Sequence, residues 1–238
     1  MEDLLSSYKC LDFEFIDAVD GRKISDQELL RQFDMGASKK RYGRDLNRGE
    51  IGCVLSHRKV FETFLKTDLP YALVFEDDIS IIRDLNQLDG EDVNLNLGTQ
   101  IPTIVFLSGD FWYYRKKRDI VSCYDALGAY AYMLNRAAAQ LLITYQKPYF
   151  VADDWCVHKS KGLKLKAIKP YMVDANLQMD LLSSDIKQYQ WGANRRRMSL
   201  KELISSIVTS SIKRILKTLG LFEAKSRVID GKVVNNQL

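Results

Sequence analysis

The 238-residue sequence lacks the cysteine patterns of secreted and metal-binding domains. Its four cysteines are widely spaced and form no CxxC pair, which predicts free thiols in a reducing compartment. The first residues show no basic segment followed by an apolar stretch, so no secretory signal is predicted. No run reaches the length of about 20 apolar residues that a membrane-spanning helix needs. Together these absences favour a cytoplasmic protein.

Three common catalytic or nucleotide-binding motifs are also missing. The chain contains no GxGxxG and no Walker A sequence, which disfavours dinucleotide-binding and P-loop proteins. It contains no GxSxG elbow, which disfavours a serine hydrolase. The 46% hydrophobic and 28% charged content is ordinary for a globular protein, and no internal repeat is visible. The active groups must therefore be sought among the acidic and histidine residues.

Positive charge is concentrated at the end of the chain. Residues 195–238 carry a net charge of +7, whereas residues 1–194 carry −3. An acidic body argues against a nucleic-acid-binding core, and a basic tail favours contact with a polyanionic surface. We therefore expect no nucleic-acid partner.

The basic tail has the pattern of an amphipathic helix. Between residues 200 and 219 the apolar positions recur at helical spacing, and Lys201, Lys213, Arg214 and Lys217 lie on the opposite face. This pattern predicts that residues 195–220 adsorb to an anionic membrane surface. The alternative is that the apolar face docks on the protein's own domain. We expect a domain at 1–194 and a basic, membrane-associating tail at 195–238.

Strand and helix patterns alternate through residue 170, which predicts one layered α/β domain. The capping-box pattern at Ser25 opens a helix, and the Gly- and Arg-rich stretch 36–48 reads as a basic loop. Residues 83–100 are polar and also read as a loop. The remaining expected elements are strands at 13–17, 71–75, 103–107, 129–134 and 164–168, the last at a sheet edge, and helices at 25–33, 49–66 and 136–145.

The apolar run 71–75 ends in three carboxylates, Glu76, Asp77 and Asp78. Ligand sites of open α/β sheets form where strands end. Adjacent carboxylates repel one another, and a divalent metal that carries a phosphate-linked substrate would supply their counter-charge. In an extended segment Glu76 and Asp78 share one side and Asp77 faces the other. The alternative is an ordinary solvated acidic turn.

A second acidic pair, Asp153 and Asp154, precedes Trp155 and His158. One helical turn would put Asp154 and His158 on the same face. A carboxylate beside an aromatic ring suits sugar chemistry, because the acid accepts a hydroxyl proton and the ring offers a flat face to a pyranose. The alternative is a helix N-terminus that favours acids, with Trp155 in the core.

Ser56 and His57 lie on the predicted helix 49–66. His57 falls at the edge of its apolar stripe, beside Phe61 and Phe64. A single histidine in such a place is commonly a packed side chain bonded through one nitrogen. The functional alternative is that Ser56 and His57 face a phosphate or sugar beside the acidic strand end.

Six motifs in order resemble the family-25 glycosyltransferases of lipooligosaccharide biosynthesis. They are "FxFIDAVDGR" at 13–22, "GEIGCVLSHRKVF" at 49–61, "YALVFEDDI" at 71–79, "GAYAYMLNRAAAQLL" at 128–142, "VADDW" at 151–155, and the spaced Pro170, Gln178 and Ser184 to Ile186. The resemblance spans about residues 8–187. Each motif is modest alone, but the ordered set is specific.

The resemblance implies an inverting, nucleotide-sugar-dependent transferase of the GT-A type, with UDP-galactose as donor, a lipooligosaccharide or LPS core sugar as acceptor, and Mn²⁺ or Mg²⁺ as cofactor. It implies donor or cofactor binding by Asp17, Ala18, Val19, Ser56, His57, Glu76 and Asp77. Metal ligands would come from Asp78, Glu76 and His158. Either Asp153 or Asp154 would be the catalytic base. The protein would be peripheral on the cytoplasmic face of the bacterial inner membrane.

One departure from the family pattern bears on activity. Relatives begin with an apolar Val-Ile-Asn-Leu strand, whereas this chain starts at Met1-Glu-Asp, near the end of the following helix. Loss of that strand would leave an unpaired sheet edge and a depleted donor pocket. Ala129 also stands where many relatives have Thr. The alternative function is therefore a weakened or inactive remnant that binds a nucleotide sugar or glycan. A metal-dependent phosphohydrolase that uses the same acids is a third, more weakly supported hypothesis.

Overall fold

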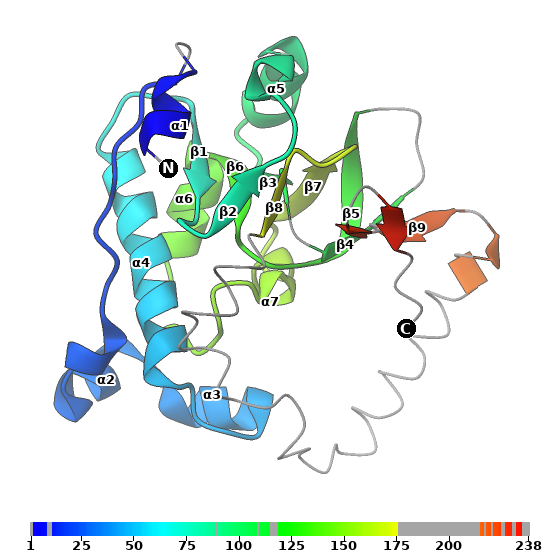
Figure 1. The fold of residues 1–238 in the computed structure, drawn as a ribbon. Helices are drawn as coiled ribbons and strands as arrows, with labels where there is room; N and C mark the ends of the chain where they lie inside the picture. The colour runs from blue at the N-terminus through cyan, green and yellow to red at the C-terminus, as the bar shows by residue number, and fades with distance from the viewer. Residues whose placement is uncertain are drawn as a thin grey trace.

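The computed structural model describes residues 2–8, 11–88, 90–108, 110–114, 119–175, 215–216, 218–219, 221–224, 227–229 and 232–234. Its centre is a seven-stranded mixed sheet (Figure 1). Strands β3 and β7 pair in parallel and the other neighbours are antiparallel. The mixed α/β class predicted from the sequence is confirmed. The strand order is β1 (Tyr71–Phe75), β6 (Ala131–Asn135), β3 (Thr103–Phe106), β7 (Lys164–Ile168), β5 (Ile120–Leu127), β4 (Asp110–Tyr114) and β9 (Phe222–Ala224).

Helices cover both faces of this sheet. α4 (Arg48–Leu65), α6 (Arg136–Ile143) and α7 (Trp155–Lys159) contribute to one hydrophobic cluster. α5 (Gly90–Leu97) and the β2–β8 pair contribute to the other. The smaller elements are α1 (Glu2–Ser6), η1 (Gly21–Lys23), α2 (Asp26–Gln32), α3 (Met35–Tyr42), β2 (Ile79–Ile81), η2 (Leu85–Gln87), β8 (Val173–Ala175) and the β10 (Arg227–Ile229) and β11 (Lys232–Val234) pair.

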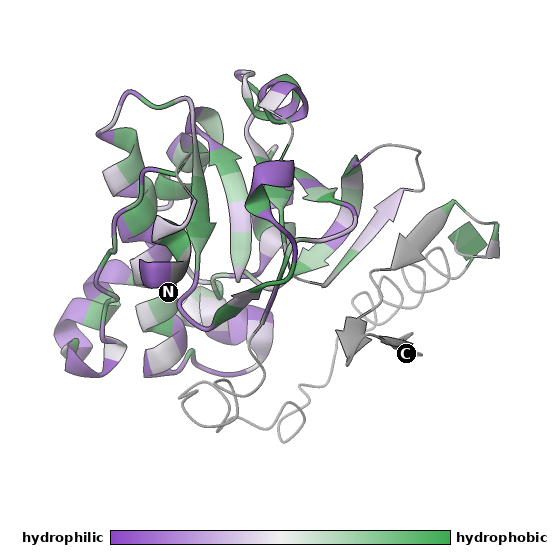
Figure 2. Cartoon of the chain, turned by 45° about the horizontal axis from the view of Figure 1, so that its top comes forward, coloured by the Kyte–Doolittle hydropathy of each residue, from purple (hydrophilic) through white to green (hydrophobic). Residues whose placement is uncertain are grey.

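Successive side chains of a strand point to opposite faces of the sheet, so a single strand contributes to both hydrophobic clusters. On β3, Ile104 and Phe106 join the cluster under α4 and α6, while Val105 joins the opposite cluster. On β6, Tyr132 and Leu134 face α4 in the same way. All residues of β3 and β6 are buried, and Figure 2 shows these strands as predominantly hydrophobic. Apolar runs, rather than strict alternation with polar residues, are typical of strands covered on both faces.

Helix α4 is the longest described element and its ends are well specified. The Asn47 side chain accepts a hydrogen bond from the Glu50 N–H, and the Glu50 carboxylate accepts from the Asn47 N–H, which forms a capping box. Arg44 donates to the same carboxylate at 2.7 Å, so the buried charge of Glu50 is paired. Apolar residues on one side, including Phe61 and Phe64, pack on the sheet. The predicted helix 49–66 is confirmed.

The strand predicted at 13–17 is wrong. Residues 11–20 have no regular secondary structure and run beside α4 (Figure 1). The alternation is present, but Phe15 is exposed and the backbone bonds to helix side chains instead of a neighbouring strand. Alternation alone does not make a strand when no ladder partner is available.

Three other sequence assignments were wrong. Residues 36–48 include helix α3, because Asp34 caps its first turn and Gly43 ends it in the left-handed conformation at φ 73°. Residues 83–100 include α5, whose Val93 and Leu97 are buried in the second cluster. Strand β7 lies between β3 and β5 rather than at an edge. The end signals of α3 are local and were overlooked, whereas the burial of α5 and the central place of β7 depend on packing with distant parts of the chain.

Part of the predicted tail joins the sheet. β9 pairs antiparallel with β4, so residues 222–224 extend the main sheet. Most of the predicted amphipathic helix lies outside the described residues, and its membrane contact stays a prediction. Within the part of the chain that is described, no helix combines the length and apolar character required to span a bilayer.

The segment 17–21 and helix α4 approach too closely for a side chain between them. A Cβ at Gly52 would lie 2.5 Å from the Val19 carbonyl oxygen and 2.9 Å from the Gly21 nitrogen. We predict that Gly52→Ala lowers the free energy of unfolding by about 1–3 kcal/mol, because backbone atoms would have to move apart. Urea unfolding measures this.

Gly36→Ala is the matched control, because its Cβ in helix α3 would have nothing closer than 3.5 Å. There alanine should stabilise the helix by about 0.5–1 kcal/mol. Equal stability of the Gly52→Ala protein and the wild type would contradict the close packing.

Candidate functional site

Helix α4 holds the segment of Asp17, Ala18 and Val19 against the domain. The Ser56 hydroxyl accepts a hydrogen bond from the Val19 N–H at 2.9 Å and donates to the Gly52 carbonyl at 2.8 Å. The Lys59 ammonium donates to the Asp17 carbonyl at 3.0 Å. Asp17 and Ala18 remain exposed. Ser56 thus positions the predicted donor-side segment by hydrogen bonding its backbone.

His57, one residue further on, faces the sheet. Its Nδ1 lies 2.7 Å from the Tyr132 hydroxyl on β6, and its Nε2 lies 3.2 Å from Glu76 Oε1. Burial alone would lower the pKa of His57, but Tyr132, Cys53 and Glu76 together raise it well above its usual value. Burial raises the pKa of Tyr132 to about 12, so its hydroxyl stays protonated. This geometry links the second and third sequence motifs directly.

The acidic residues lie at the turn between β1 and β2. Glu76 and Asp78 are partly buried and Asp77 is exposed, but residues 77 and 78 form a turn and not the extended segment for which the two-sided arrangement was predicted. Cys53, His57 and Glu76 have potential ligand atoms within 4.8 Å of one another. Asp78 and His158, also predicted as metal ligands, are not members of this cluster. Within the described residues, Glu76 is therefore where the histidine and acidic motifs meet.

Asp153 lies beside a loop at the end of the sheet. Its Oδ2 accepts a hydrogen bond from the Gly128 N–H at 3.2 Å, and the Trp155 indole donates to the Gly128 carbonyl at 2.9 Å. Gly128 adopts φ 85°, a conformation that favours glycine. Burial raises the pKa of Asp153; two backbone hydrogen bonds oppose the rise, and Asp154 and Glu76 add to it. The two acidic motifs are thus electrostatically coupled.

Asp154 is held by helix α3 and has no capping role. Arg41 donates two hydrogen bonds to its carboxylate, one of 2.7 Å, and the Tyr42 hydroxyl donates a third at 2.5 Å. Although Asp154 precedes α7, its side chain makes no cap hydrogen bond there. These bonds occupy both oxygens of the Asp154 carboxylate. The sequence left Asp153 and Asp154 equivalent, and their environments distinguish them.

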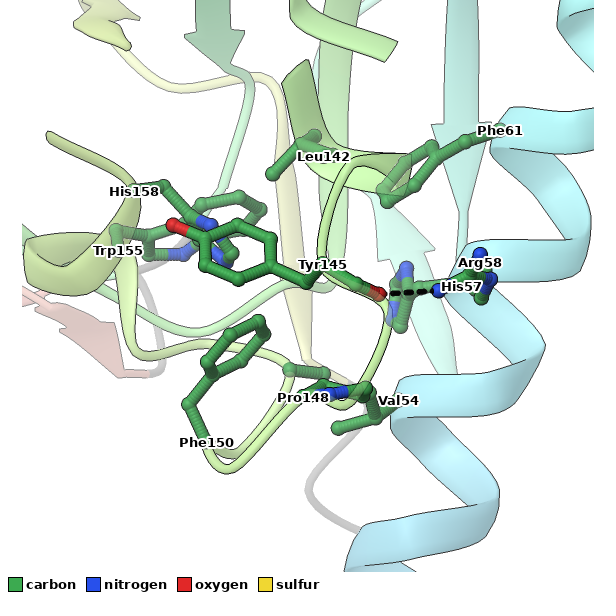
Figure 3. A pocket seen from close by; sticks show the side chains of 11 residues that line it. Val54, His57, Arg58, Phe61, Leu142, Tyr145, Pro148, Phe150, Trp155 and His158 are labelled. Atoms are coloured by element: carbon green, nitrogen blue, oxygen red, sulfur yellow. Dashed lines mark hydrogen bonds between the residues drawn. The ribbon is translucent and has the colours of Figure 1, made fainter. Parts of the chain in front are cut away.

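The two histidines of the chain line one cavity of about 30 Å³ (Figure 3). Tyr145 projects into it toward His158, with ring centroids 5.4 Å apart, and Phe150 and Trp155 surround the same imidazole. Burial lowers the pKa of His158 to about 4, and its Nδ1 is buried with no hydrogen-bond partner among the described residues. This volume suits one or two waters and not a sugar.

The structure brings together Asp17 to Val19, Ser56, His57 and Glu76 around α4. His158 is kept apart by its aromatic surroundings. Sequence reasoning missed Cys53, although its spacing of four from His57 was a usable signal. It also missed Arg41, Tyr42 and Tyr132, whose contacts with Asp154 and His57 span 75 to 113 residues along the chain.

We predict that His158 makes the free energy of unfolding sensitive to acid. Because its folded-state pKa is near 4 and its unfolded value near 6.5, only the unfolded chain gains this proton as the pH falls between them. The unfolding free energy should therefore fall on acidification from about pH 6.5, by at most about 1.4 kcal/mol per pH unit from this group.

Urea unfolding between pH 5 and 7 should show a shallower slope for His158→Phe than for the wild type. The difference between the two slopes cancels the pH dependence of stability that Asp153 and His57 contribute to both proteins. Parallel slopes for the two proteins would contradict the prediction.

Comparison with known proteins identifies the family. The model of glycosyltransferase family 25 (LPS biosynthesis protein) matches residues 1–157. A glycosyltransferase 25 family member from Aedes aegypti is 42% identical over 72 residues, which are 29% of this chain and 12% of that protein. Procollagen galactosyltransferase 1-B from Xenopus laevis is 32% identical over 72 residues, again 29% and 12%.

A probable inactive glycosyltransferase 25 family member 3 from Rattus norvegicus is 37% identical over 68 residues, which are 27% of this chain and 12% of that protein. The matched segments therefore cover only a small part of each relative. The family match itself spans more than half of the present sequence. The chain belongs to glycosyltransferase family 25.

Proposed function

We propose that the chain is an inverting GT-A-type transferase that moves a hexose, galactose from UDP-galactose, onto a lipooligosaccharide or LPS core sugar. The observation that carries the proposal is geometric: α4 bonds the segment 17–19 through Ser56 and the acidic end of β1 through His57, and the carboxylate of Asp153 is held at Gly128. Such a site offers both an anionic end for a metal and diphosphate and a separate carboxylate for proton transfer. Both are needed for single-displacement glycosyl transfer.

The donor side would be formed by the acidic turn and the segment 17–19. Glu76 and Asp78 supply carboxylate oxygens, the ligand type that Mn²⁺ and Mg²⁺ prefer. Two protein carboxylates fit this role, because substrate phosphates commonly complete the coordination of such ions. A bound cation would neutralise the charge that builds on departing UDP. Asp17 and Ala18, exposed beside α4, are available to a nucleotide.

Asp153 is the better candidate for the catalytic base. Its raised pKa brings it closer to the range in which a carboxylate accepts a proton effectively. It would take the proton of the acceptor hydroxyl while that oxygen bonds to the anomeric carbon and the bond to UDP breaks. Attack from the face opposite UDP inverts the anomeric carbon. No covalent enzyme intermediate is needed.

Asp154 has a positioning role in this proposal. Its bonds to Arg41 and Tyr42 fix the start of α7 against α3. Asp153, the preceding residue, is thereby held next to Gly128. The same contacts occupy the Asp154 oxygens, which supports assigning proton transfer to its neighbour.

The proposed substrates draw on the family. The family is described as one of LPS biosynthesis proteins, and one relative is named as a procollagen galactosyltransferase. The first supports an LPS acceptor, and the second supports galactose as the donated sugar.

A second candidate is a silent protein that binds a nucleotide sugar or glycan. It is favoured by relatives in Rattus norvegicus and Bos taurus that are named as probable inactive members. Incubation with Mn²⁺, UDP-galactose and a lipooligosaccharide acceptor separates the candidates. Acceptor-dependent release of UDP supports the transferase. UDP binding without turnover supports the silent binder, and acceptor-independent phosphate release would point to a phosphohydrolase.

We predict that Asp153→Asn lowers kcat by about 10²–10⁴-fold with near-normal affinity for UDP, since asparagine cannot accept the hydroxyl proton. Steady-state UDP release and equilibrium binding measure the two quantities. Asp154→Asn is the matched control and should lower the thermal unfolding midpoint while it retains more turnover. Full activity of the Asp153→Asn protein would place the base elsewhere.

We also predict that Asp78→Ala weakens Mn²⁺-dependent UDP binding by about tenfold or more, about 1.4 kcal/mol. Isothermal titration with and without Mn²⁺ measures the effect. Asp77→Ala is the control, because the Asp77 side chain is exposed whereas that of Asp78 is partly buried. Equal UDP affinity of the Asp78→Ala and wild-type proteins in Mn²⁺ would remove Asp78 from the donor site.

A further inference from the structure

We propose that Cys53, His57 and Glu76 form a binding site for Zn²⁺, which shares only Glu76 with the carboxylate pair suggested for Mn²⁺. The three residues offer a thiolate, an imidazole nitrogen and a carboxylate oxygen within 4.8 Å of one another. This inference does not depend on the proposed transferase activity, and metal binding alone tests it.

Two of the ligands come from one rigid helix. Cys53 and His57 are four residues apart within the 18-residue α4, so their side chains lie on the same face, one turn apart. The third comes from the end of β1, where the Glu76 N–H donates to the Tyr130 carbonyl at 2.9 Å. A helix and a strand end thus fix the ligands, which keeps the cost of ordering them low.

The distances suit a tetrahedral ion. His57 Nε2 and Glu76 Oε1 are 3.2 Å apart, and all three ligand atoms fall within 4.8 Å. Around tetrahedral Zn²⁺, with bonds of about 2.0–2.3 Å, neighbouring ligand atoms are about 3.3–3.7 Å apart. Small side-chain movements are enough to bring the cluster to this spacing.

Tyr132 supplies the outer contact that zinc-bound histidines require. Its hydroxyl lies 2.7 Å from His57 Nδ1, which leaves Nε2 directed toward Glu76. A hydroxyl can donate or accept, so it can receive the Nδ1–H bond when Nε2 binds a metal. Such outer contacts fix the tautomer and orientation of metal-bound histidine. Tyr132 is fully buried and therefore well fixed itself.

The ligand types select zinc over manganese. A thiolate and an imidazole favour Zn²⁺, whereas Mn²⁺ and Mg²⁺ favour oxygen ligands. Binding would release the Cys53 thiol proton and the His57 Nε2 proton to solvent. Three protein ligands leave the fourth position to water or a substrate atom. The Glu76 side chain is 27% exposed, which gives an ion a route to the cluster.

The other described cysteines are less suitable. Cys123 is buried, and burial raises the pKa of its thiol strongly. Cys156 is exposed as a residue, and its thiol donates a hydrogen bond to Asp125 at 3.1 Å. Partial burial of the sulfur atom, together with this contact, raises the pKa of the thiol to about 11. Neither belongs to a cluster of three potential ligands. Cys156 therefore provides a control thiol that is easy to substitute.

Cobalt substitution tests the proposal on the whole 238-residue chain. Co²⁺ takes tetrahedral zinc sites, and a cobalt–thiolate bond gives an intense near-ultraviolet charge-transfer band. We expect one Co²⁺ per chain with this band, loss of the band on addition of one equivalent of Zn²⁺, and its absence in Cys53→Ser. Zn²⁺ affinity, measured by competition with a chromogenic chelator, should fall by about 100-fold or more in that variant.

Cys156→Ser and Asp78→Ala are the controls and should keep the band, since neither residue is in the cluster. His57→Gln should lose tetrahedral cobalt absorption while circular dichroism shows that it is folded. Absence of the band in the wild type, or its persistence in Cys53→Ser, would overturn the proposal. In that case the three groups form only a packed polar cluster. Because no readout depends on UDP, failure here leaves the transferase proposal untouched.

Discussion

The candidate site depends on the contact of His57 with both Tyr132 and Glu76. This one side chain joins α4 to the centre of the sheet and to the acidic end of β1. Ser56, its neighbour, joins the other side of α4 to the segment 17–19. An imidazole can bond through two nitrogens at once, which explains why a histidine is useful at a three-way junction. The packing of α4 therefore sets the relative positions of the proposed donor-side groups.

A second set of contacts positions the proposed base. Asp153 and Asp154 are adjacent in sequence but have opposite surroundings. Arg41 and Tyr42 occupy the Asp154 carboxylate, whereas burial, Asp154 and Glu76 raise the pKa of Asp153. Two identical neighbouring residues thereby acquire different surroundings, and only the carboxylate of Asp153 is left for proton transfer in the proposed reaction. The distinction arises wholly from long-range contacts.

The sequence predicted the fold class, α4 and the four strands β1, β3, β6 and β7, because these elements carry strong apolar patterns or local caps. It also predicted the acidic turn, since three adjacent carboxylates after an apolar strand are unusual. It did not predict β4, β5 or β9. The prediction of a strand at 13–17 failed because the residues alternate but have no neighbouring strand to pair with. The prediction of a loop at 36–48 failed because Asp34 and Gly43 cap a helix there despite the loop-like composition. Tyr132 and Arg41 could not be predicted, because their site contacts are distant in sequence.

The arginines around α3 have a consequence for anion recognition. Arg41 pairs with Asp154, Arg44 with Glu50, and Arg48 with Asp26. The three guanidinium groups of this cationic stretch are therefore already paired with carboxylates of the fold, and Lys39 and Lys40 are the exposed cations beside them. A nucleoside diphosphate that bound one of these arginines would have to compete with its carboxylate. Backbone N–H groups, or a cation that the diphosphate carries in with it, would not face this competition.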